Sequence, residues 1–264
     1  MKKLIIVKIG GNVIDNPIEL EKFLSDFSTI DDLKILVHGG GALATELANK
    51  MDIPQTMVNG RRVTDANTLN IATMVYAGLI NKQITAALQA KKVNAIGLSG
   101  ADGNSIRTTK RKVTEIDYGF VGDIIESGVN DEFISTILNT TGTPVFCAIT
   151  HDGEGQLLNT NADTIASALA VALSKHYDVQ LHYCFEKKGV LRDVNDDNSV
   201  IQTITKAQYN ELKSHGIIFK GMIPKMDNAF EAIENGVNSV IIAQSTDLLM
   251  SLNKENHAGT TLIA

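Results

Sequence analysis

Short apolar runs alternate with amphipathic segments along most of the chain. Continuous apolar runs predict buried strands at 4–9, 35–37, 95–98, 144–149, 179–185 and 239–243, with another strand expected at 260–263. Helical spacing of apolar positions predicts helices at 19–27, 42–50, 64–91, 131–139, 162–173, 205–214 and 222–234. Residues 105–125 are interpreted as a β excursion with a turn at Tyr118-Gly119. Regular alternation of strands and helices predicts an α/β fold with a mainly parallel sheet.

Three consecutive glycines, Gly39 to Gly41, lie between one of these strands and the next helix. Glycine allows the backbone to approach a ligand closely, and the free amides of a helix N-terminus favour an anion. A sharp turn alone is the competing interpretation, although it needs only one glycine. The motif therefore suggests a phosphate or carboxylate site.

A dinucleotide fold is the second alternative, because Gly39-x-Gly41-x-x-Ala44 fits its glycine fingerprint. That fingerprint also needs an acidic residue at the end of the next strand, roughly 20 residues further on. The only nearby acid, Asp65, stands at a predicted helix start, which disfavours a NAD(P)-dependent oxidoreductase. The sequence also contains no P-loop motif.

Composition narrows the choice of partners. The 264 residues carry a formal net charge of −6 without a basic block, which argues against binding of nucleic acid or an anionic membrane. No apolar segment approaches the length of a membrane span. Cys147 and Cys184 both lie in apolar runs, so we expect buried, reduced thiols and a cytoplasmic location.

Two cationic features are candidates for chemistry. Lys8 interrupts a buried strand directly before Gly10-Gly11, where its ammonium group could meet a polyanion or simply extend to water. Arg61 and Arg62 precede a helix, either as a solvated pair or as planar donors for carboxylates.

A third polar group stands at the start of the 162–173 helix. Asn159, Asn161 and Asp163 alternate there, and a helix cap would need only one of them. Lys225 is a second lysine near a glycine, and no histidine or cysteine is arranged as a nucleophile. Together these features suit phosphoryl transfer by positioning and charge neutralisation.

The sequence resembles the amino acid kinase family almost from end to end. K-I-G-G at 8–11 and V-H-G-G-G at 37–41 are typical of the family as a whole. N-G-x-R-V-T-D at 59–65 and N-x-N-A-D at 159–163 are specific to its acylglutamate branch. Further matching segments are N-K-Q-I at 81–84, I-G-L-S-G-A-D-G at 96–103, G-F-V-G-D-I at 119–124, G-V-L at 189–191 and G-M-I-P-K at 221–225.

The resemblance implies an open, mainly parallel central sheet sandwiched between helices and divided into two lobes. Residues 1–174 would form an N-terminal lobe for acylglutamate binding and dimerisation, and residues 175–264 a C-terminal lobe for ATP. The implied reaction moves the γ-phosphoryl group of ATP to the side-chain carboxylate of an N-acyl-L-glutamate in arginine biosynthesis. Mg²⁺ would be held mainly by the ATP phosphates, so no protein ligand is expected for the metal.

The resemblance also implies roles for individual residues. Lys8 and Lys225 would stabilise the transferring phosphoryl group, Asp163 would orient these lysines, and Gly11 would donate a backbone amide. The substrate would be bound by Gly40, Gly41, Arg62, Asn159, Asn161 and Arg61. ATP would be bound by Gly10, Glu186, Lys188, Gly189, Ile217, Phe219 and Met222.

Arg61 departs from the family, which usually has leucine or methionine there in the wall around the acyl group. An additional guanidinium group suggests N-succinylglutamate rather than N-acetylglutamate as substrate. The alternative is that Arg61 points into solvent, since a surface charge needs no function.

Two further departures concern the nucleotide and assembly. The usual T/S-D-V-x-G reads Phe185-Glu186-Lys187-Lys188-Gly189, which could alter nucleotide affinity. The chain begins at its first strand without the N-terminal helix of arginine-inhibited hexamers, so we expect a homodimer insensitive to arginine, with helix 64–91 as candidate contact.

Binding of a PII-type regulator is left open. A kinase-like ligand sensor is the alternative function, disfavoured by the retention of Lys8, Asp163 and Lys225.

Overall fold

The structure is a computed structural model that describes residues 1–58, 61–140, 142–218, 222–253 and 258–264. The chain folds into two compact units. Unit 1 consists of Met1–Ile35 and Ala166–Ala264, and unit 2 consists of Leu36–Ile165. The first strand therefore belongs with the C-terminal half of the chain, unlike in the expected lobes 1–174 and 175–264. The assignment of one ligand to each lobe stays a prediction.

Unit 1 is built on five strands in the order β12-β14-β13-β11-β1. Their bounds are β1 (Lys3–Ile9), β11 (Asp178–Phe185), β12 (Thr203–Thr205), β13 (Ser239–Gln244) and β14 (Thr260–Ile263). β1, β11 and β13 are parallel, and β14 runs antiparallel to β13. Continuous apolar sequence suits the central strands because both of their faces are buried.

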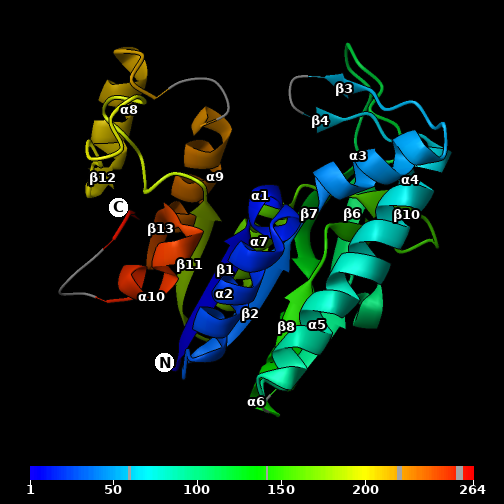
Figure 1. Ribbon diagram of the computed structural model, residues 1–264, viewed down its shortest axis with the longest axis horizontal. Helices are drawn as coiled ribbons and strands as arrows, with labels where there is room; N and C mark the ends of the chain where they lie inside the picture. The colour runs from blue at the N-terminus through cyan, green and yellow to red at the C-terminus, as the bar shows by residue number, and fades with distance from the viewer. Residues whose placement is uncertain (59–60, 141, 219–221, 254–257) are drawn as a thin grey trace. The chain divides into compact units, whose positions relative to one another are not determined.

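The helices of unit 1 include two that begin at side-chain caps. The helices are α1 (Gly11–Asp15), α2 (Pro17–Ser28), most of α7 (Ala162–Leu173), α8 (Lys206–Ser214), α9 (Met222–Glu234), η3 (Ser245–Asp247) and α10 (Leu248–Ser251) (Figure 1). The Asn16 side chain accepts from the amides of Ile18 and Glu19 at the start of α2. Thr205 and Gln208 form a reciprocal capping box at the start of α8.

Unit 2 contains a parallel set of strands in the order β2-β8-β5, namely β2 (Leu33–His38, from Leu36 onwards), β8 (Thr143–Phe146) and β5 (Ala95–Leu98). A second sheet has the order β10-β9-β6-β7, with bounds Leu157–Asn159, Ile149–His151, Ile106–Lys110 and Gly122–Val129. β3 (Met57–Val58) and β4 (Arg61–Arg62) form a separate antiparallel pair.

The helices of unit 2 are α3 (Gly41–Lys50), α4 (Ala66–Ala72), η1 (Thr73–Ile80), α5 (Asn81–Ala90), η2 (Asp102–Asn104) and α6 (Asp131–Asn139). α5 packs on β5 and β8 (Figure 1). The expected helix 64–91 is present as the contiguous run α4-η1-α5, whose middle part η1 has π-helical hydrogen bonding. The run begins at Ala66, two residues later than expected, and its cap is Asp65, whose side chain accepts from the Thr68 amide at 2.7 Å.

The predicted α/β fold with a mainly parallel sheet flanked by helices is confirmed. The strand expected at 144–149 is two strands, because β8 ends at Phe146 and β9 begins at Ile149 in the other sheet of unit 2. Sequence patterns also missed the five-residue helix α1, which is too short for a helical period. In the described part of the chain, no helix has the length and apolar character needed to cross a membrane.

Candidate functional site

In unit 1, two lysines converge on one aromatic ring. Lys8 lies near the end of β1 and is 7 % exposed, while Lys225 lies in the first turn of α9. The Lys225 Nζ is 3.6 Å from the centroid of the Phe185 ring, and the Lys8 Nζ is 5.4 Å from it. Phe185 is the last residue of β11, which pairs with β1 in parallel register. An aromatic face attracts ammonium groups, so Phe185 helps to gather two like charges.

The first glycine turn directly follows Lys8. The Gly10 amide donates to the backbone oxygen of Cys184 at 3.2 Å, which fixes the end of β1 against β11. Gly11 is the first residue of α1, so its amide has no hydrogen-bond acceptor within that helix. Cys184 itself is buried, and burial raises the pKa of its thiol to about 12. The expectation of buried, free thiols is confirmed for both cysteines.

In unit 2, the second glycine turn is held by Arg62 and α3. Gly40 caps α3 with φ of +145°, a conformation that favours glycine. The Arg62 Nη2 donates to the Gly41 backbone oxygen and to the Thr45 hydroxyl, both at 2.8 Å. Its Nη1 donates to the Gln55 side-chain oxygen. The structure thus brings together three of the predicted substrate residues, Gly40, Gly41 and Arg62.

A buried histidine supports the same turn from behind. The His38 Nδ1 is 2.9 Å from the Gly39 oxygen, and its Nε2 is 3.1 Å from the Asn81 amide nitrogen. Asn81 also donates to the Val145 oxygen at 2.9 Å, so Nε2 is the acceptor and Nδ1 carries the proton. Burial lowers the pKa of His38 to about 4, and nearby Lys82 adds to this effect. His38 is therefore neutral near pH 7.

The asparagines before α7 have two different tasks. The Asn159 side chain donates to the Thr64 hydroxyl at 3.1 Å, which ties β10 to the segment that carries Arg62. The Asn161 side chain caps α7 by accepting from the amides of Asp163 and Thr164 at 2.8 and 3.1 Å. Asp163 is buried in the first turn of this helix. The predicted role of Asp163 in orienting the two lysines stays a prediction.

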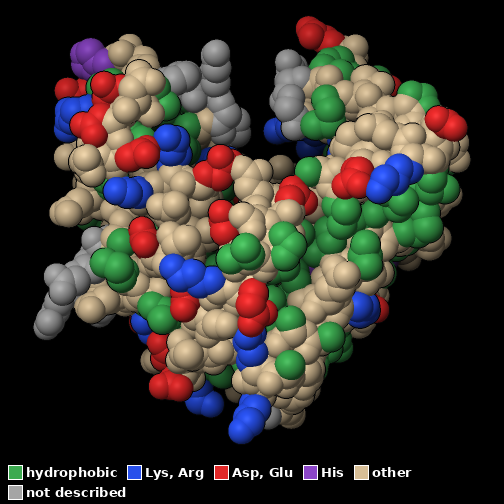
Figure 2. Space-filling view, viewed as in Figure 1, with side chains coloured by type: hydrophobic (Ala, Val, Ile, Leu, Met, Phe, Trp, Pro, Cys, Tyr) green, Lys and Arg blue, Asp and Glu red, His purple; other side chains and the backbone are tan. Residues whose placement is uncertain are grey.

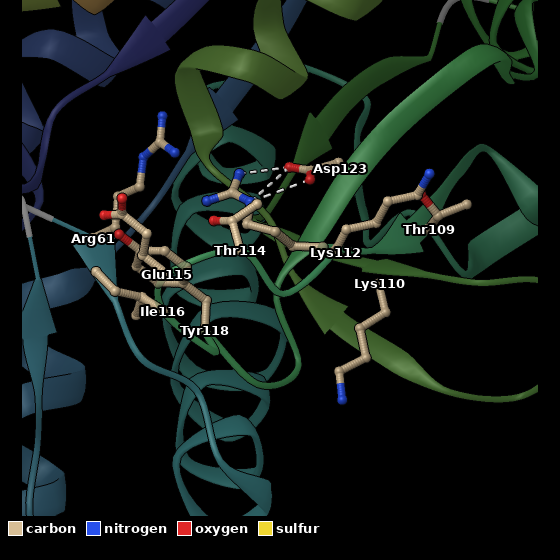
Figure 3. Close-up of a pocket in the computed structure, with 10 residues that line it drawn as sticks. Arg61, Thr109, Lys110, Lys112, Thr114, Glu115, Ile116, Tyr118 and Asp123 are labelled. Atoms are coloured by element: carbon tan, nitrogen blue, oxygen red, sulfur yellow. Dashed lines mark hydrogen bonds and ion pairs between the residues drawn. The ribbon is translucent and has the colours of Figure 1, made fainter.

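Arg61 lies apart from the Arg62 cluster. Neighbouring residues of a strand point to opposite faces, and Arg61 lines a cavity of about 530 Å³ formed mainly by the segment between β6 and β7. The cavity is lined by Arg61, Thr109, Lys110, Arg111, Lys112, Thr114, Glu115, Ile116, Tyr118 and Asp123 (Figure 3). The sequence predicted a binding role for Arg61, at the acyl group, but for no other residue of this cavity.

The residues expected to bind ATP are in unit 1. Glu186 and Lys188 are exposed after β11, and Gly189 is buried beside Thr260, whose hydroxyl accepts from the Val190 amide at 2.8 Å. Ile217 and Met222 are partly exposed. Phe219 lies outside the described residues. The nearby Lys187 forms an exposed ion pair with Asp197 at 2.9 Å.

This arrangement offers cations and backbone amides for an anion. Among the residues that the structure describes, no group of three or more His, Cys, Asp or Glu side chains is placed to hold a metal ion. Sequence reasoning missed Phe185, Thr45 and Gln55 as partners of the functional cations. No local motif identifies them, because each meets its cation through folding of separate elements.

Comparisons with known proteins agree with this chemistry. Residues 3–244 match the amino acid kinase family. The acetylglutamate kinase of Cytophaga hutchinsonii is 55% identical over 265 residues and covers all of both chains. The acetylglutamate kinase of Phocaeicola vulgatus is 55% identical over 241 residues, which are 91% of this chain and 93% of that protein.

Solved structures show the same fold. The N-acetylglutamate synthase of Neisseria gonorrhoeae, complexed with coenzyme A and N-acetyl-glutamate, superposes with a TM-score of 0.84 at 22% identity. All of this chain is covered, but only 59% of that longer chain. Carbamate kinase from Giardia lamblia, bound to AMP-PNP, gives 0.70 at 16% identity and covers 99% of this chain and 98% of its own. From its motifs, its fold and its full-length relatives, the chain belongs to the amino acid kinase family.

Proposed function

We propose that the protein transfers the γ-phosphoryl group of ATP to the side-chain carboxylate of an N-acyl-L-glutamate in arginine biosynthesis. The observation that supports this most strongly is the end-to-end identity of 55% to a curated acetylglutamate kinase. The residues of the two glycine turns and the lysines add chemical support, because they supply the donors that a transferring phosphoryl group needs.

The proposed transfer is direct. The substrate carboxylate is ionised near pH 7, since an ordinary glutamate side chain has a pKa of about 4.3, and it therefore needs no general base. Its oxygen forms a bond to the γ-phosphorus while the bond to the bridging oxygen of ADP breaks. Lys8 and Lys225 neutralise the charge that develops on the phosphoryl oxygens, and the Gly11 amide donates to them.

Bound Mg²⁺ supplies additional charge neutralisation on the ATP phosphates, which are expected to be its main ligands. Asp163 orients the lysines in this proposal. Glu186, Lys188, Gly189, Ile217 and Met222 bind the nucleotide, together with Gly10.

Substrate binding is assigned to the cluster in unit 2. Three partners hold the Arg62 guanidinium beside the Gly40-Gly41 turn, which supports a fixed donor for the α-carboxylate. Asn159, tied to Thr64, is assigned to the substrate amide. Asn161 contributes to the site indirectly, because its side chain caps α7.

The acyl group is acetyl or succinyl in this proposal. The names of the curated relatives support acetyl. The position of Arg61 in a cavity with other basic residues supports a second, negatively charged acyl group. The alternative function is a kinase-like ligand sensor without phosphoryl transfer, because a fold by itself does not determine an activity.

The deciding experiment traps the acyl phosphate with hydroxylamine in the presence of Mg-ATP and either N-acetyl- or N-succinyl-L-glutamate. Turnover of at least one substrate is expected, with loss of about two orders of magnitude or more in Lys8→Met, because the lysine stabilises transition-state charge. Binding of ATP and substrate without any acyl phosphate would favour the sensor. An Arg61→Leu variant that kept the wild-type preference between the two substrates would remove Arg61 from acyl selection.

We also propose that the chain forms a homodimer through the helical run α4-η1-α5. Met74 and Leu79 are 49 % and 46 % exposed on η1. Apolar side chains gather over the upper and middle part of this helical run in the space-filling view (Figure 2). Exposed apolar surface of this kind often marks an interface.

A further inference from the structure

The cavity beside Arg61 holds an arginine with one unused side of its guanidinium group. The Arg111 Nε donates to the two oxygens of Asp123 at 3.0 and 3.1 Å, and Nη2 donates to Oδ1 of the same carboxylate. The guanidinium carbon also lies 5.4 Å from the centroid of the Tyr118 ring. These contacts fix the orientation of the group before any ligand arrives.

The remaining nitrogen of this group lacks an acceptor. Arg111 Nη1 is buried, and no described residue accepts a hydrogen bond from it. A buried donor without a partner is costly, so an acceptor that reaches it gains an unusually strong interaction. Residues 112–118 form no regular secondary structure, and Lys112 to Glu115 are exposed.

The charge and shape of the cavity identify the class of ligand. Four basic side chains and two acidic ones line it, and one of the acids, Asp123, is already paired with Arg111. Figure 3 shows Arg61, Glu115, Ile116 and Tyr118 on one side of the cavity, while Lys110 points away from them. The Lys110 Nζ is 5.0 Å from the Phe120 ring. Ile116 and Tyr118 provide apolar surface for a short methylene chain that ends in an anion.

Backbone hydrogen bonds connect this cavity to the substrate cluster of unit 2. The Arg111 amide donates to the Val121 oxygen at 2.7 Å, and Val121 forms a β-bridge with Asn159. The Thr64 amide donates to the Tyr118 oxygen at 2.9 Å. The backbone segments that form the cavity are thus linked to Asn159 and to the segment that follows Arg62.

We propose that this cavity binds a carboxylate at the end of a short aliphatic chain, with Arg111 as the residue that determines specificity and Arg61 as the second cation. The proposal rests on the proposed function in one respect: the carboxylate either ends a dicarboxylic acyl group on the substrate or belongs to a free small dicarboxylate. Glu115 opposes binding of such an anion because it adds a like charge.

The test compares wild type with Arg111→Gln, Glu115→Gln and the control Arg107→Gln. Arg107 is an exposed arginine on β6, the strand that ends directly before Arg111, but it does not line the cavity. Acyl-phosphate formation is measured with N-acetyl- and N-succinyl-L-glutamate, and folding is checked by thermal unfolding. We expect the succinyl-to-acetyl ratio of kcat/KM to fall about tenfold or more in Arg111→Gln. It should rise in Glu115→Gln and stay constant in Arg107→Gln.

A second arm distinguishes the two sources of the carboxylate. Calorimetric titration of succinate into the protein without substrate is expected to show Arg111-dependent binding if the ligand is a free dicarboxylate. A changed substrate ratio without succinate binding identifies the acyl group as the source. Unchanged ratios in both variants together with no succinate binding overturn the proposal. If wild type phosphorylates neither substrate, the kinase assignment fails. Succinate titration then still tests whether the cavity binds a carboxylate.

Discussion

At the scale of single residues, the two lysines proposed to stabilise the transferring phosphoryl group share one aromatic neighbour. The Nζ atoms of Lys225 and Lys8 lie 3.6 and 5.4 Å from the centroid of the Phe185 ring. These residues come from α9, β1 and β11, so the contacts form only when separate elements pack together. Lys8 stands out in the sequence as an ammonium group beside two glycines, whereas no local signal marks Phe185.

The Phe185 ring leads to a first prediction. Phe185→Leu keeps an apolar side chain but removes the negative face of the ring, which is worth about 0.5–2 kcal/mol per ammonium group. We expect kcat to fall by about threefold to thirtyfold in steady-state assays, with a smaller change in Phe185→Tyr, which retains the ring. Equal rates in wild type and Phe185→Leu would show that the lysines are positioned by other groups.

His38 leads to a prediction on pH dependence. Its pKa is about 4 in the folded protein and about 6.5 in the unfolded chain, so the unfolded chain binds the proton first as the pH falls. The stabilising contribution is complete above pH 6.5 and is lost progressively toward pH 4. This one group should lower the free energy of unfolding by about 2 kcal/mol between pH 7.5 and pH 5.

Urea unfolding at both pH values measures this effect, and His38→Gln is the comparison. The variant is less stable at pH 7.5, because the glutamine cannot reproduce both hydrogen bonds of the imidazole, but its stability should depend less on pH. An identical pH dependence in wild type and variant would mean that other groups cause the acid sensitivity.

At the scale of elements, strand and helix positions were largely predictable, whereas their ends and fine geometry were not. The helical run 64–91 was predicted from its apolar period, but its cap is Asp65 and its middle is π-helical. Adjacent Thr and Asp are both good caps, so propensity could not separate them. The pair β3-β4 was not predicted because each strand has only two residues.

The packing of the π-helical segment η1 against Gly40 leads to a prediction on stability. A Cβ atom on Gly40 would collide with Ile80 Cδ1 and lie 3.2 Å from Tyr76 Cδ1, and the φ of +145° is strained for other residues. Gly40→Ala should therefore lose about 1–3 kcal/mol of stability. Gly41→Ala is the matched control, because its Cβ would make only ordinary contacts at 3.7 and 3.9 Å. Chemical denaturation that ranks Gly41→Ala as the less stable variant would contradict this.

The same helical run carries the prediction on assembly. Met74→Asp and Leu79→Asp place charges on its exposed apolar surface without disturbing a buried side chain. If this surface forms the proposed dimer, light scattering should give a lower mass for the variants than for wild type, and the monomer fraction should rise on dilution. Retention of the wild-type mass in a double variant would exclude this face.

At the scale of the whole molecule, the family and its α/β architecture were predictable from alternating elements and spaced motifs. The division of the chain was not, because residues 1–35 form part of unit 1 through β1, which pairs in register with β11. Pairing of a strand with a partner about 175 residues further on leaves no local signal. The structure therefore shows which unit contains each candidate residue, whereas the ligand that each unit binds is a proposal.

Hydrogen exchange can test that assignment of ligands to units. A non-hydrolysable ATP analogue should slow exchange of unit 1 amides at 8–11 and 184–190, because bound ligand suppresses local opening. N-acetyl- or N-succinyl-L-glutamate alone should protect unit 2 amides at 39–41, 62–64 and 157–161. The magnitude follows mass action: at a ligand concentration a hundred times Kd, the bound state gains about 2.7 kcal/mol.

Because α5 and α6 contain none of the proposed ligand-binding residues, their exchange serves as the internal control in both experiments. Protection of unit 2 by the nucleotide analogue alone, with no change at 184–190, would reverse the assignment. It would also remove the Glu186–Gly189 segment from the nucleotide site.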